Sequence, residues 1–194
     1  MRSFAEIVTK IFNPLLAILA TITGVVWVQQ ISLNEKVTWL ALGLLVSILP
    51  AVVLYLQYKK GEISSLWSPS AQQRQKTFLV WVVSAGVFSL ATFWLDAPRL
   101  VTALALTLLA LGILNLTLTT TLKISVHLQA ITLFVITLLL SVSVSLVYLI
   151  ALIPLVAWAR LQLKAHDLSE VSLGALSAVI VVYTVFSFFG LATF

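Results

Sequence analysis

The sequence is poor in charged residues. Only 9% of its 194 residues are Asp, Glu, Lys or Arg, while 61% are hydrophobic. An ordinary soluble domain is about a quarter charged. So few charges cannot cover a water-exposed surface. The composition therefore excludes a soluble globular domain and predicts an integral membrane protein.

Further absences narrow the function. Cysteine is absent, which excludes disulfides and Cys-ligated metals and leaves the redox compartment open. The net charge of +5 comes without a basic run interleaved with aromatic residues, so we expect no nucleic-acid partner. No cluster of carboxylates could hold magnesium, so we expect no metal or other cofactor. The first apolar stretch is longer than the core of a cleavable signal peptide, which we do not expect here.

The sequence contains instead a series of long apolar runs. A helix needs about 20 mostly apolar residues to cross the hydrocarbon core. The runs predict an all-α, multi-pass transmembrane helical bundle of six or seven spans. The division that we favour has spans near residues 8–30, 37–58, 77–95, 99–122, 124–141, 145–161 and 169–192. Because the run from Leu128 to Ala159 is too long for one span, we predict a tight hairpin at Ser141, Ser143 and Ser145.

The basic residues predict the orientation, since cytoplasmic loops are enriched in Lys and Arg. With the N-terminus inside, only Lys36 and Arg99 fall on the outer side. The inner residues are Arg2, Lys10, Lys59, Lys60, Arg74, Lys76, Lys123, Arg160 and Lys164. We therefore expect the N-terminus and the basic loop 59–76 on the cytoplasmic side of a single membrane domain, residues 1–194. Its N-terminal spans occupy residues 1–122, and residues 123–194 carry the motifs described below.

We interpret the prolines and tryptophans as structural. Pro14, Pro50 and Pro154 fall inside predicted spans, where each removes a backbone donor. The tryptophans mostly fall near span ends, which suits an amphipathic ring at the depth of the headgroups. They are Trp27, Trp39, Trp67, Trp81, Trp94 and Trp158.

Both histidines lie among ionisable residues at predicted inner ends of spans. One group, residues 123–127, enters the fifth span, and the other, residues 160–170, joins the sixth span to the seventh. A charged group at mid-span costs about 2.5 to 3.5 kcal/mol on insertion scales. Such a grouping beside the hydrocarbon therefore indicates a function.

The two groups contain the residue types that phosphoryl transfer requires. His166 and Glu170 are four residues apart, on one helical face. The carboxylate can accept the proton of one imidazole nitrogen and leave the other as a base or nucleophile. The planar guanidinium of Arg160 suits a phosphoryl group, and Lys123 adds positive charge. With His127 to protonate a leaving oxygen, the combination predicts transfer through a phosphohistidine.

In this pattern the sequence resembles the type 2 phosphatidic acid phosphatase (PAP2) superfamily of membrane lipid phosphatases. The third motif of that family is Ser-Arg, five residues, His, three residues, Asp. This chain has Ala159 and Arg160, five residues, His166, three residues and Glu170. The resemblance covers roughly the last 75 residues, and as in the family two predicted helices separate the second and third motifs.

The other two motifs of the family are altered. The second, Pro-Ser-Gly-His, corresponds to residues 124–127, where Ser and His are retained but Ile124 and Val126 replace Pro and Gly. The first, Lys, six residues, Arg-Pro, is missing. Either Lys123 supplies its charge, or Arg74 and Lys76 from the inner loop fold over the site.

The resemblance implies a role for each site residue. By it, His166 is the nucleophile, Glu170 its orienting acid and His127 the general acid. Arg160 and Ser125 are phosphate ligands, to which our own analysis adds Lys123 and, as a further candidate, Arg74. The family commonly has its site on the outer or lumenal side, whereas the charge distribution predicts the inner side here.

Each residue also has a structural interpretation. Residues Asp167 to Glu170 fit a helix capping box. Arg160 and Lys164 at the end of a span fit the positive-inside rule. His127 alone fits a polar contact between helices, and loop 59–76 fits a solvated connector beside anionic headgroups. The polar inner end of the fourth span either lines a substrate cleft or bonds neighbouring helices. It comprises Asn115, Thr117, Thr119, Thr120 and Thr121.

The sequence thus predicts a metal-independent membrane phosphatase that removes phosphate from a lipid phosphate or diphosphate. Phosphatidate and a polyprenyl diphosphate are the expected substrates, and membrane lipids are the other expected partners. One alternative is a transporter or channel, which the absence of charge from the middle of the spans disfavours. The other is a non-catalytic relative that binds lipid, which the altered motifs favour. The oligomeric state stays open.

Overall fold

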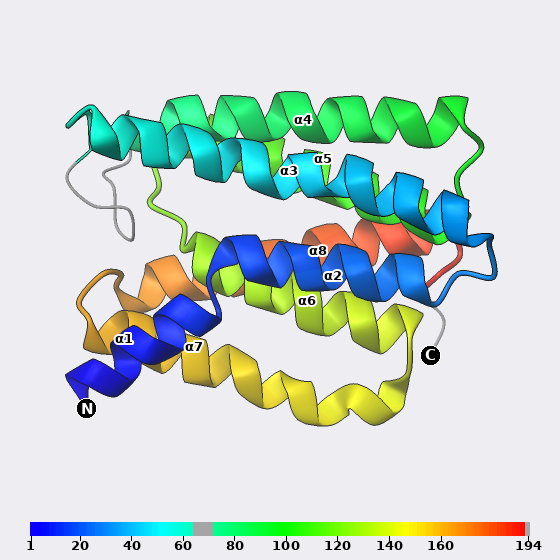
Figure 1. Ribbon diagram of the computed structural model, residues 1–194. Helices are drawn as coiled ribbons and strands as arrows, with labels where there is room; N and C mark the ends of the chain where they lie inside the picture. The colour runs from blue at the N-terminus through cyan, green and yellow to red at the C-terminus, as the bar shows by residue number, and fades with distance from the viewer. Residues whose placement is uncertain (64–71, 193–194) are drawn as a thin grey trace.

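The computed structural model describes residues 1–63 and 72–192, and every regular element in these residues is helical. Each predicted span is helical for most of its length, although two of them comprise two helices each (Figure 1). The α-helices are α1 (Arg2–Ile11), α2 (Pro14–Trp27), α3 (Leu33–Lys59), α4 (Gln75–Trp94), α5 (Arg99–Leu118), α6 (Val126–Ser141), α7 (Leu152–Gln162) and α8 (Leu168–Phe188). Two 3-10 helices, η1 (Gln72–Arg74) and η2 (Val144–Ala151), lead into α4 and α7.

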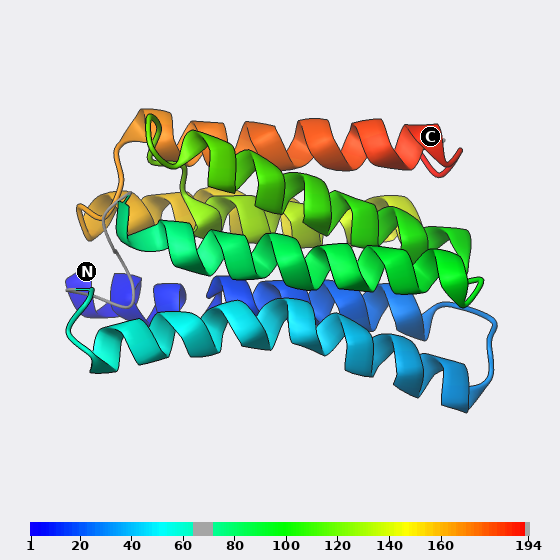
Figure 2. The same ribbon diagram turned by 90° about the horizontal axis from the view of Figure 1, so that it is seen from above.

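The helices pack in three groups (Figures 1 and 2). Helices α3, α4 and α5 follow one another and pack side by side. Helix α6 packs between α2 and α8, and α1 packs against α7 beside it. Contacts of α2 with α3 and of α5 with α8 join the groups into one bundle.

Two apolar cores hold the bundle together. The larger includes Phe88, Leu104 and Leu108, at most 1% exposed, where α4 and α5 meet the rest. The smaller joins α1, α6, α7 and α8 and includes Leu128, Ala159 and Val171. Since each of these three residues adjoins a predicted site residue in the chain, the smaller core fixes the backbone from which the site side chains project.

The predicted hairpin between the fifth and sixth spans is present. Helix α6 ends at Ser141, and η2 begins at Val144. The side chain of Ser143 accepts a hydrogen bond from the backbone N–H of Ser145 at 3.1 Å and caps the start of η2. A serine that bonds to its own turn replaces a helical bond with a local one, which is why the apolar run reverses here.

The first predicted span, 8–30, is wrong as a single helix. It is divided between α1 and α2 by a bend of 40°. Asn13 caps α2 by accepting from the N–H of Leu16 at 3.0 Å, and Pro14 follows as the first helical residue. Proline is tolerated there because that N–H has no helical partner. Pro14 therefore starts a helix instead of interrupting one; Pro154 lies in the first turn of α7, and Pro50 lies inside α3.

Within the residues that the structure describes, five helices are long and apolar enough to cross a membrane, with η2 and α7 together counted as one, or six if the bent pair α1 and α2 also counts as one span. Several helices of this length and hydropathy are consistent with a multi-pass integral membrane protein. Helices α2 and α6 have only 14 and 16 residues, or about 21 and 24 Å against a hydrocarbon core of about 30 Å. Both start well inward of the end of α3 (Figure 1). Residues at their starts, Pro14 in α2 and Val126 in α6, line a cavity described below.

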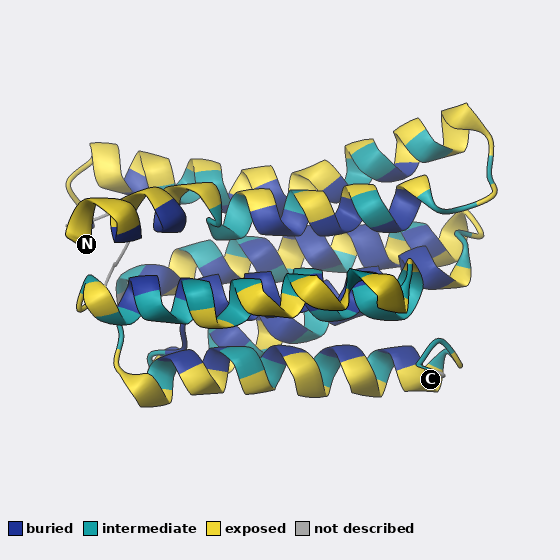
Figure 3. Cartoon of the chain, turned by 90° about the horizontal axis from the view of Figure 1, so that it is seen from below, coloured by how far each residue is buried: buried dark blue, intermediate teal, exposed yellow. Residues whose placement is uncertain are grey.

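The outside of the bundle is apolar where lipid would cover it. Along α4, Leu79, Val83, Val87 and Leu90 are 53–59% exposed. Their spacing of three or four residues places them on one face. Exposed residues also follow the outer faces of the other long helices (Figure 3).

The basic residues gather at one end of the bundle. The N-terminus and the connections after α3, α5 and α7 lie together there, and the connections after α2, α4 and α6 lie at the opposite end (Figure 1). All Lys and Arg residues except Lys36 and Arg99 belong to the first end, hereafter the basic end. This is the distribution that the sequence predicts for the two sides of a membrane.

Single cysteines can test which side the basic end faces, because the chain has no cysteine of its own. Lys164, exposed after α7, and Gln30, exposed between α2 and α3, mark the two ends. We expect a membrane-impermeant maleimide added to intact cells to label Gln30→Cys but not Lys164→Cys until the cells are opened. The reverse pattern would place the basic end outside.

Candidate functional site

The first turn of α8 is held by a complete capping box. The Asp167 carboxylate accepts from the N–H of Glu170 at 2.8 Å, and the Glu170 carboxylate accepts from the N–H of Asp167 at 3.3 Å. These bonds satisfy two backbone donors that the helix leaves open. They also lower the pKa of Asp167, because its hydrogen bonds with the Glu170 N–H and the Ser169 hydroxyl favour the charged form. The capping role expected of Glu170 is therefore real.

The turn before α8 has a fixed shape. Helix α7 ends with bonds from the Lys164 N–H to the Leu161 carbonyl and from the Ala165 N–H to the Arg160 carbonyl, at 2.9 and 3.1 Å. This is a Schellman motif, whose left-handed residue is usually glycine. Here it is Lys164, with φ of 53°. The turn delivers His166 to the first turn of α8 in one orientation.

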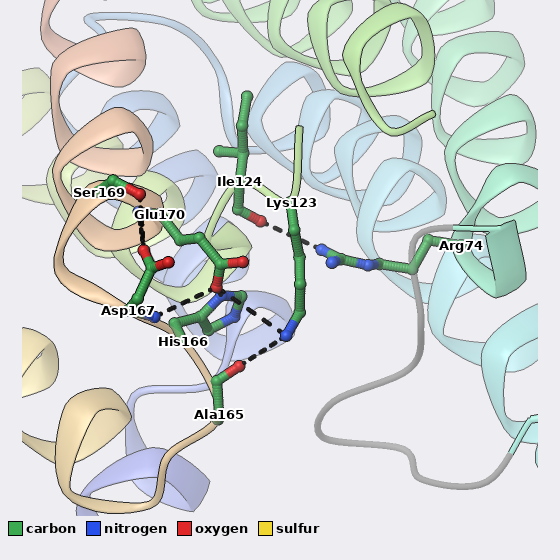
Figure 4. Close-up of polar contacts among 8 residues, drawn as sticks. All are labelled: Arg74, Lys123, Ile124, Ala165, His166, Asp167, Ser169 and Glu170. Atoms are coloured by element: carbon green, nitrogen blue, oxygen red, sulfur yellow. Dashed lines mark hydrogen bonds and ion pairs between the residues drawn. The ribbon is translucent and has the colours of Figure 1, made fainter. Parts of the chain in front are cut away.

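His166 and Glu170 form the dyad that the sequence predicts. His166 Nδ1 lies 2.7 Å from Glu170 Oε2, and the two side chains are only 5% and 19% exposed (Figure 4). Burial, with the positive charges of Arg160, Lys123 and Arg74 nearby, lowers the pKa of His166 to about 3. The imidazole is therefore neutral at pH 7, with Nδ1–H donating to the carboxylate and Nε2 carrying a lone pair. The same carboxylate both caps α8 and orients the histidine.

Lys123 closes this cluster from the α5–α6 connection. Its ammonium donates to the Ala165 carbonyl at 2.9 Å and lies 3.9 Å from Glu170 Oε2 (Figure 4). Part of its charge is thus used to hold the turn that carries His166. Lys123 contributes positive charge to the site while it ties residues 123–127 to residues 160–170.

The start of α6 rests directly on α8. The Ser125 N–H donates to the Glu170 carbonyl at 3.1 Å. A Cβ at Gly174 would lie 2.5 Å from the Ser125 carbonyl oxygen, closer than real Cβ atoms come. Only glycine allows this approach. The two groups of residues that the sequence analysis singled out are therefore joined through backbone atoms.

Two polar side chains at the start of α6 are buried without a partner. Ser125 is the N-cap residue, yet its hydroxyl makes no capping bond, and Ser125 Oγ and His127 Nε2 have no hydrogen-bond partner. Their residues are 0% and 7% exposed. Buried polar atoms normally find partners, so an unpaired set calls for an explanation such as a missing ligand.

Arg74 reaches the site from η1. Its Nη1 donates to the Ile124 carbonyl at 3.1 Å, and its Nε and Nη2 are buried without partners (Figure 4). Burial lowers the pKa of Arg74 from its usual range, yet a guanidinium stays protonated in a protein. Lys76 turns away and pairs with Glu62 at 2.8 Å. Of the two loop residues that the sequence offered, Arg74 alone joins the site; residues 64–71 of that loop lie outside the described residues.

A cavity of about 320 Å³ connects these groups to the apolar interior. Its polar end is lined by Arg74, Lys123, His127 and His166. The remainder of its wall comes from α2, α3 and α4 and is mostly apolar, including Ile18, Val46, Pro50, Leu54, Phe78 and Trp81. The cavity is therefore amphipathic, with its cations at one end.

Arg160 and the polar end of α5 lie outside that wall. Arg160 is 1% exposed and acts on the charge of His166 from behind the cavity. Asn115 donates to Gln129 at 2.6 Å, and Gln129 donates to the Ser177 hydroxyl at 3.0 Å. Asn115 therefore bonds neighbouring helices and does not line a substrate cleft. The sequence analysis did not single out Gln129, although a glutamine inside an apolar span was a visible signal.

The donor set of the site suits an anion, not a metal. Within residues 1–63 and 72–192, no three His, Asp or Glu side chains lie close enough together to hold a metal ion. The site instead supplies guanidinium, ammonium, imidazole and hydroxyl groups. Comparisons with protein-family models, curated proteins and solved structures find no match for this chain. The resemblance to the PAP2 superfamily therefore rests on the motifs alone.

Replacement of Gly174 tests the contact between α6 and α8. In Gly174→Ala the new methyl group would collide with the Ser125 backbone, and such overpacking costs about 1 to 3 kcal/mol. We expect a lower unfolding temperature in detergent. Gly86→Ala is the control, because its nearest neighbour would be Leu109 Cδ1 at 4.0 Å. Equal unfolding temperatures for the two variants would contradict a tight contact.

Proposed function

We propose that this chain is an integral membrane lipid phosphatase that hydrolyses a phosphate ester or diphosphate of a lipid through a phosphohistidine, as in the PAP2 superfamily. One observation carries the proposal. A neutral histidine, held in one orientation, and buried hydrogen-bond donors without partners lie at the same end of the cavity. The histidine is His166, held by Glu170 at 2.7 Å. The donors are Arg74 Nε and Nη2; Ser125 Oγ, at the start of α6 and outside the residues that line the cavity, is a further buried polar atom without a partner.

These groups can carry out the first half of the reaction. His166 Nε2 attacks phosphorus, so that an N–P bond forms as the bond from phosphorus to the lipid oxygen breaks. The imidazole then bears a positive charge, and Nδ1–H to Glu170 stabilises it. A bound phosphate favours the protonated form of His127 through its negative charge, and His127 passes that proton to the departing lipid oxygen. Arg74 and Lys123 neutralise the phosphoryl oxygens, with the buried charge of Arg160 behind them.

The second half returns the site to its starting state. A water molecule attacks phosphorus on the side opposite His166, and His127 takes a proton from it. The N–P bond breaks, and inorganic phosphate leaves with the oxygen of the water. The cations again carry the charge on the phosphoryl group, so that no step requires a metal ion.

The apolar part of the cavity supports a lipid substrate. Besides Arg74, the cavity is lined by Phe78 and Trp81 of α4 and by Val46 and Leu54 of α3. An apolar chain placed there stays away from water while its phosphate reaches His166. We place the site on the cytoplasmic side by the positive-inside rule.

Two other functions remain as alternatives. A non-catalytic lipid-binding relative would use the same cavity, and Val126 in place of the family's glycine favours it. A transporter would need polar coordination near mid-membrane, where the described spans hold no ionisable side chain. A phosphate-release assay distinguishes the phosphatase from both alternatives.

Substitution of the histidines tests the phosphatase function. We expect the detergent-purified protein to release phosphate from phosphatidate or a prenyl diphosphate without added metal. His166→Ala should abolish release, since it removes the nitrogen that attacks phosphorus. His127→Ala should slow release by about 10²- to 10⁴-fold, the usual contribution of a general acid. Full activity of the His166 variant would exclude this mechanism, and no release by the wild type would favour lipid binding without turnover.

Arg74 and Lys76 form a matched pair for testing the phosphate contact. Arg74→Ala should lower kcat/KM for lipid phosphate about 10- to 100-fold, the value of one or two hydrogen bonds to a charged group. Arg74→Lys should recover only part of the lost kcat/KM, because an ammonium restores the positive charge but cannot bind two phosphate oxygens at once as a guanidinium does. Lys76→Ala should leave kcat/KM unchanged, since its ammonium pairs with Glu62. Equal losses in the two alanine variants would indicate a general effect of loop charge.

A further inference from the structure

Helix α4 begins without a capping side chain. Its N-cap residue is Arg74, which makes no side-chain capping bond, whereas Ser, Thr, Asp and Asn are the usual residues at this position. The Arg74 side chain instead donates to the Ile124 carbonyl at 3.1 Å (Figure 4). That bond holds only the far end of the side chain, so the backbone that carries Arg74 requires a support of its own.

Gln57, near the end of α3, contacts the chain on both sides of Arg74. Its Oε1 accepts from the Thr77 hydroxyl at 3.1 Å, and its Nε2 donates to the Gln73 carbonyl at 3.5 Å, the longer of the two bonds. Gln73 directly precedes Arg74, and Thr77 lies in the first turn of α4. One side chain of a neighbouring helix therefore bridges the turn from which Arg74 projects.

The Gln57 amide is suited to holding this turn and lies off the cavity wall. An amide is both acceptor and donor, so it can bond to a hydroxyl and to a carbonyl at once. Gln57 is 6% exposed and is not among the residues that line the cavity, whereas Arg74 and Thr77 line it. Gln57 can therefore act on the cavity only through the residues that it holds.

Backbone bonds fix the end of α3 where Gln57 lies. The Gln57 carbonyl accepts from the Glu62 N–H at 2.9 Å, and the Glu62 carbonyl accepts from Gln73 Nε2 at 3.2 Å. These bonds tie the turn after α3 to η1. Gln57 is thus the point at which the end of α3, η1 and the first turn of α4 are joined.

We propose that Gln57 is the positioning residue of Arg74, because its bonds to Gln73 and Thr77 fix where the guanidinium lies. This rests on the proposed function, which it deepens by naming the residue that holds the phosphate contact in place. The Ile124 carbonyl and Gln57 hold the two ends of Arg74. Loss of the Gln57 amide leaves the positive charge in the site but no longer fixes its position, and misplacement of a binding group lowers the rate.

The test combines changes at Gln57 with the loss of Arg74. Gln57→Leu removes both amide bonds and keeps a side chain of similar size. Thr77→Val removes one of these bonds with little change of shape, and Thr77→Ser restores the hydroxyl. The matched control is Gln29→Leu, because the Gln29 amide donates to the Val25 carbonyl at 3.1 Å, at the opposite end of the bundle. Each change is made in the full-length wild type and in Arg74→Ala, and kcat/KM for phosphatidate is measured in detergent micelles.

We expect Gln57→Leu to lower kcat/KM about 3- to 30-fold in the wild type, less than Arg74→Ala does, because the guanidinium remains. In the Arg74→Ala background it should cause no further loss, since the residue through which it acts is gone. Thr77→Val should cause a smaller loss that Thr77→Ser recovers, and Gln29→Leu should cause none. Equal losses from Gln57→Leu in the two backgrounds would indicate a general role in packing and overturn the inference. If Gln57→Leu does not fold, the same comparison with Thr77→Val decides.

A binding measurement separates this inference from the proposed function. Inorganic phosphate is added in increasing concentration, and its dissociation constant is obtained from the rise in unfolding temperature. Gln57→Leu and Arg74→Ala should each weaken phosphate binding, and the double variant should bind phosphate no more weakly than Arg74→Ala. If the wild type shows this pattern but releases no phosphate from any lipid, the positioning role stands and the phosphatase function fails. If the wild type releases phosphate but Gln57→Leu changes neither binding nor kcat/KM, the phosphatase function stands and the positioning role fails.

Discussion

The site depends on one backbone hydrogen bond, from the Ser125 N–H to the Glu170 carbonyl at 3.1 Å. It joins the start of α6 to the first turn of α8, segments about 40 residues apart in the chain. Gly174 makes the approach possible because no side chain separates the backbones. Through this bond the residue that orients His166 also fixes the position of His127. The Glu170 side chain meanwhile caps its own helix and pairs with both His166 and Lys123, so that the helix start and these two side chains are held by the same residue.

The same region contains several buried polar groups without hydrogen-bond partners. The Arg74 guanidinium has five donor hydrogens, yet its Nε and Nη2 have no partner and only Nη1 donates, to the Ile124 carbonyl; Ser125 and His127 each bury an unpaired atom. Buried donors without partners destabilise a fold, and buried charge does so more strongly. An anion that accepts from them would remove that penalty at the moment of binding. Under the proposed function, these unfavourable electrostatics would be a source of affinity for phosphate, in the way that strain at functional sites is offset by binding.

The sequence predicted what local patterns determine and missed what tertiary contacts determine. The helical segments, the hairpin at Ser143 and the pairing of His166 with Glu170 all follow from spacing within a dozen residues. The break at Asn13 was predictable from a capping residue followed by proline, but the apolar run on either side obscured it. No local pattern shows that Arg74 joins the site while Lys76 does not. Arg74 is directed there by its bond to the Ile124 carbonyl, and Lys76 is held away by its pairing with Glu62. That the buried indole N–H of Trp81 has no hydrogen-bond partner likewise depends on how the helices pack, and no local sequence pattern predicts it.

The short helices explain how polar chemistry can meet an apolar substrate. Helices α2 and α6 are about 21 and 24 Å long, shorter than a hydrocarbon core of about 30 Å, and Pro14, Val126 and His127 near their starts line the cavity. Under the proposed function, a phosphate at the start of α6 would lie deeper than an ordinary headgroup, and the first carbons of its chains would already be inside the cavity. Lys123 and the turn at Lys164 are partly or fully exposed at the basic end. Water would then meet the phosphate from the basic end while the apolar wall holds the chains, which is the arrangement that hydrolysis of a lipid at a membrane surface requires.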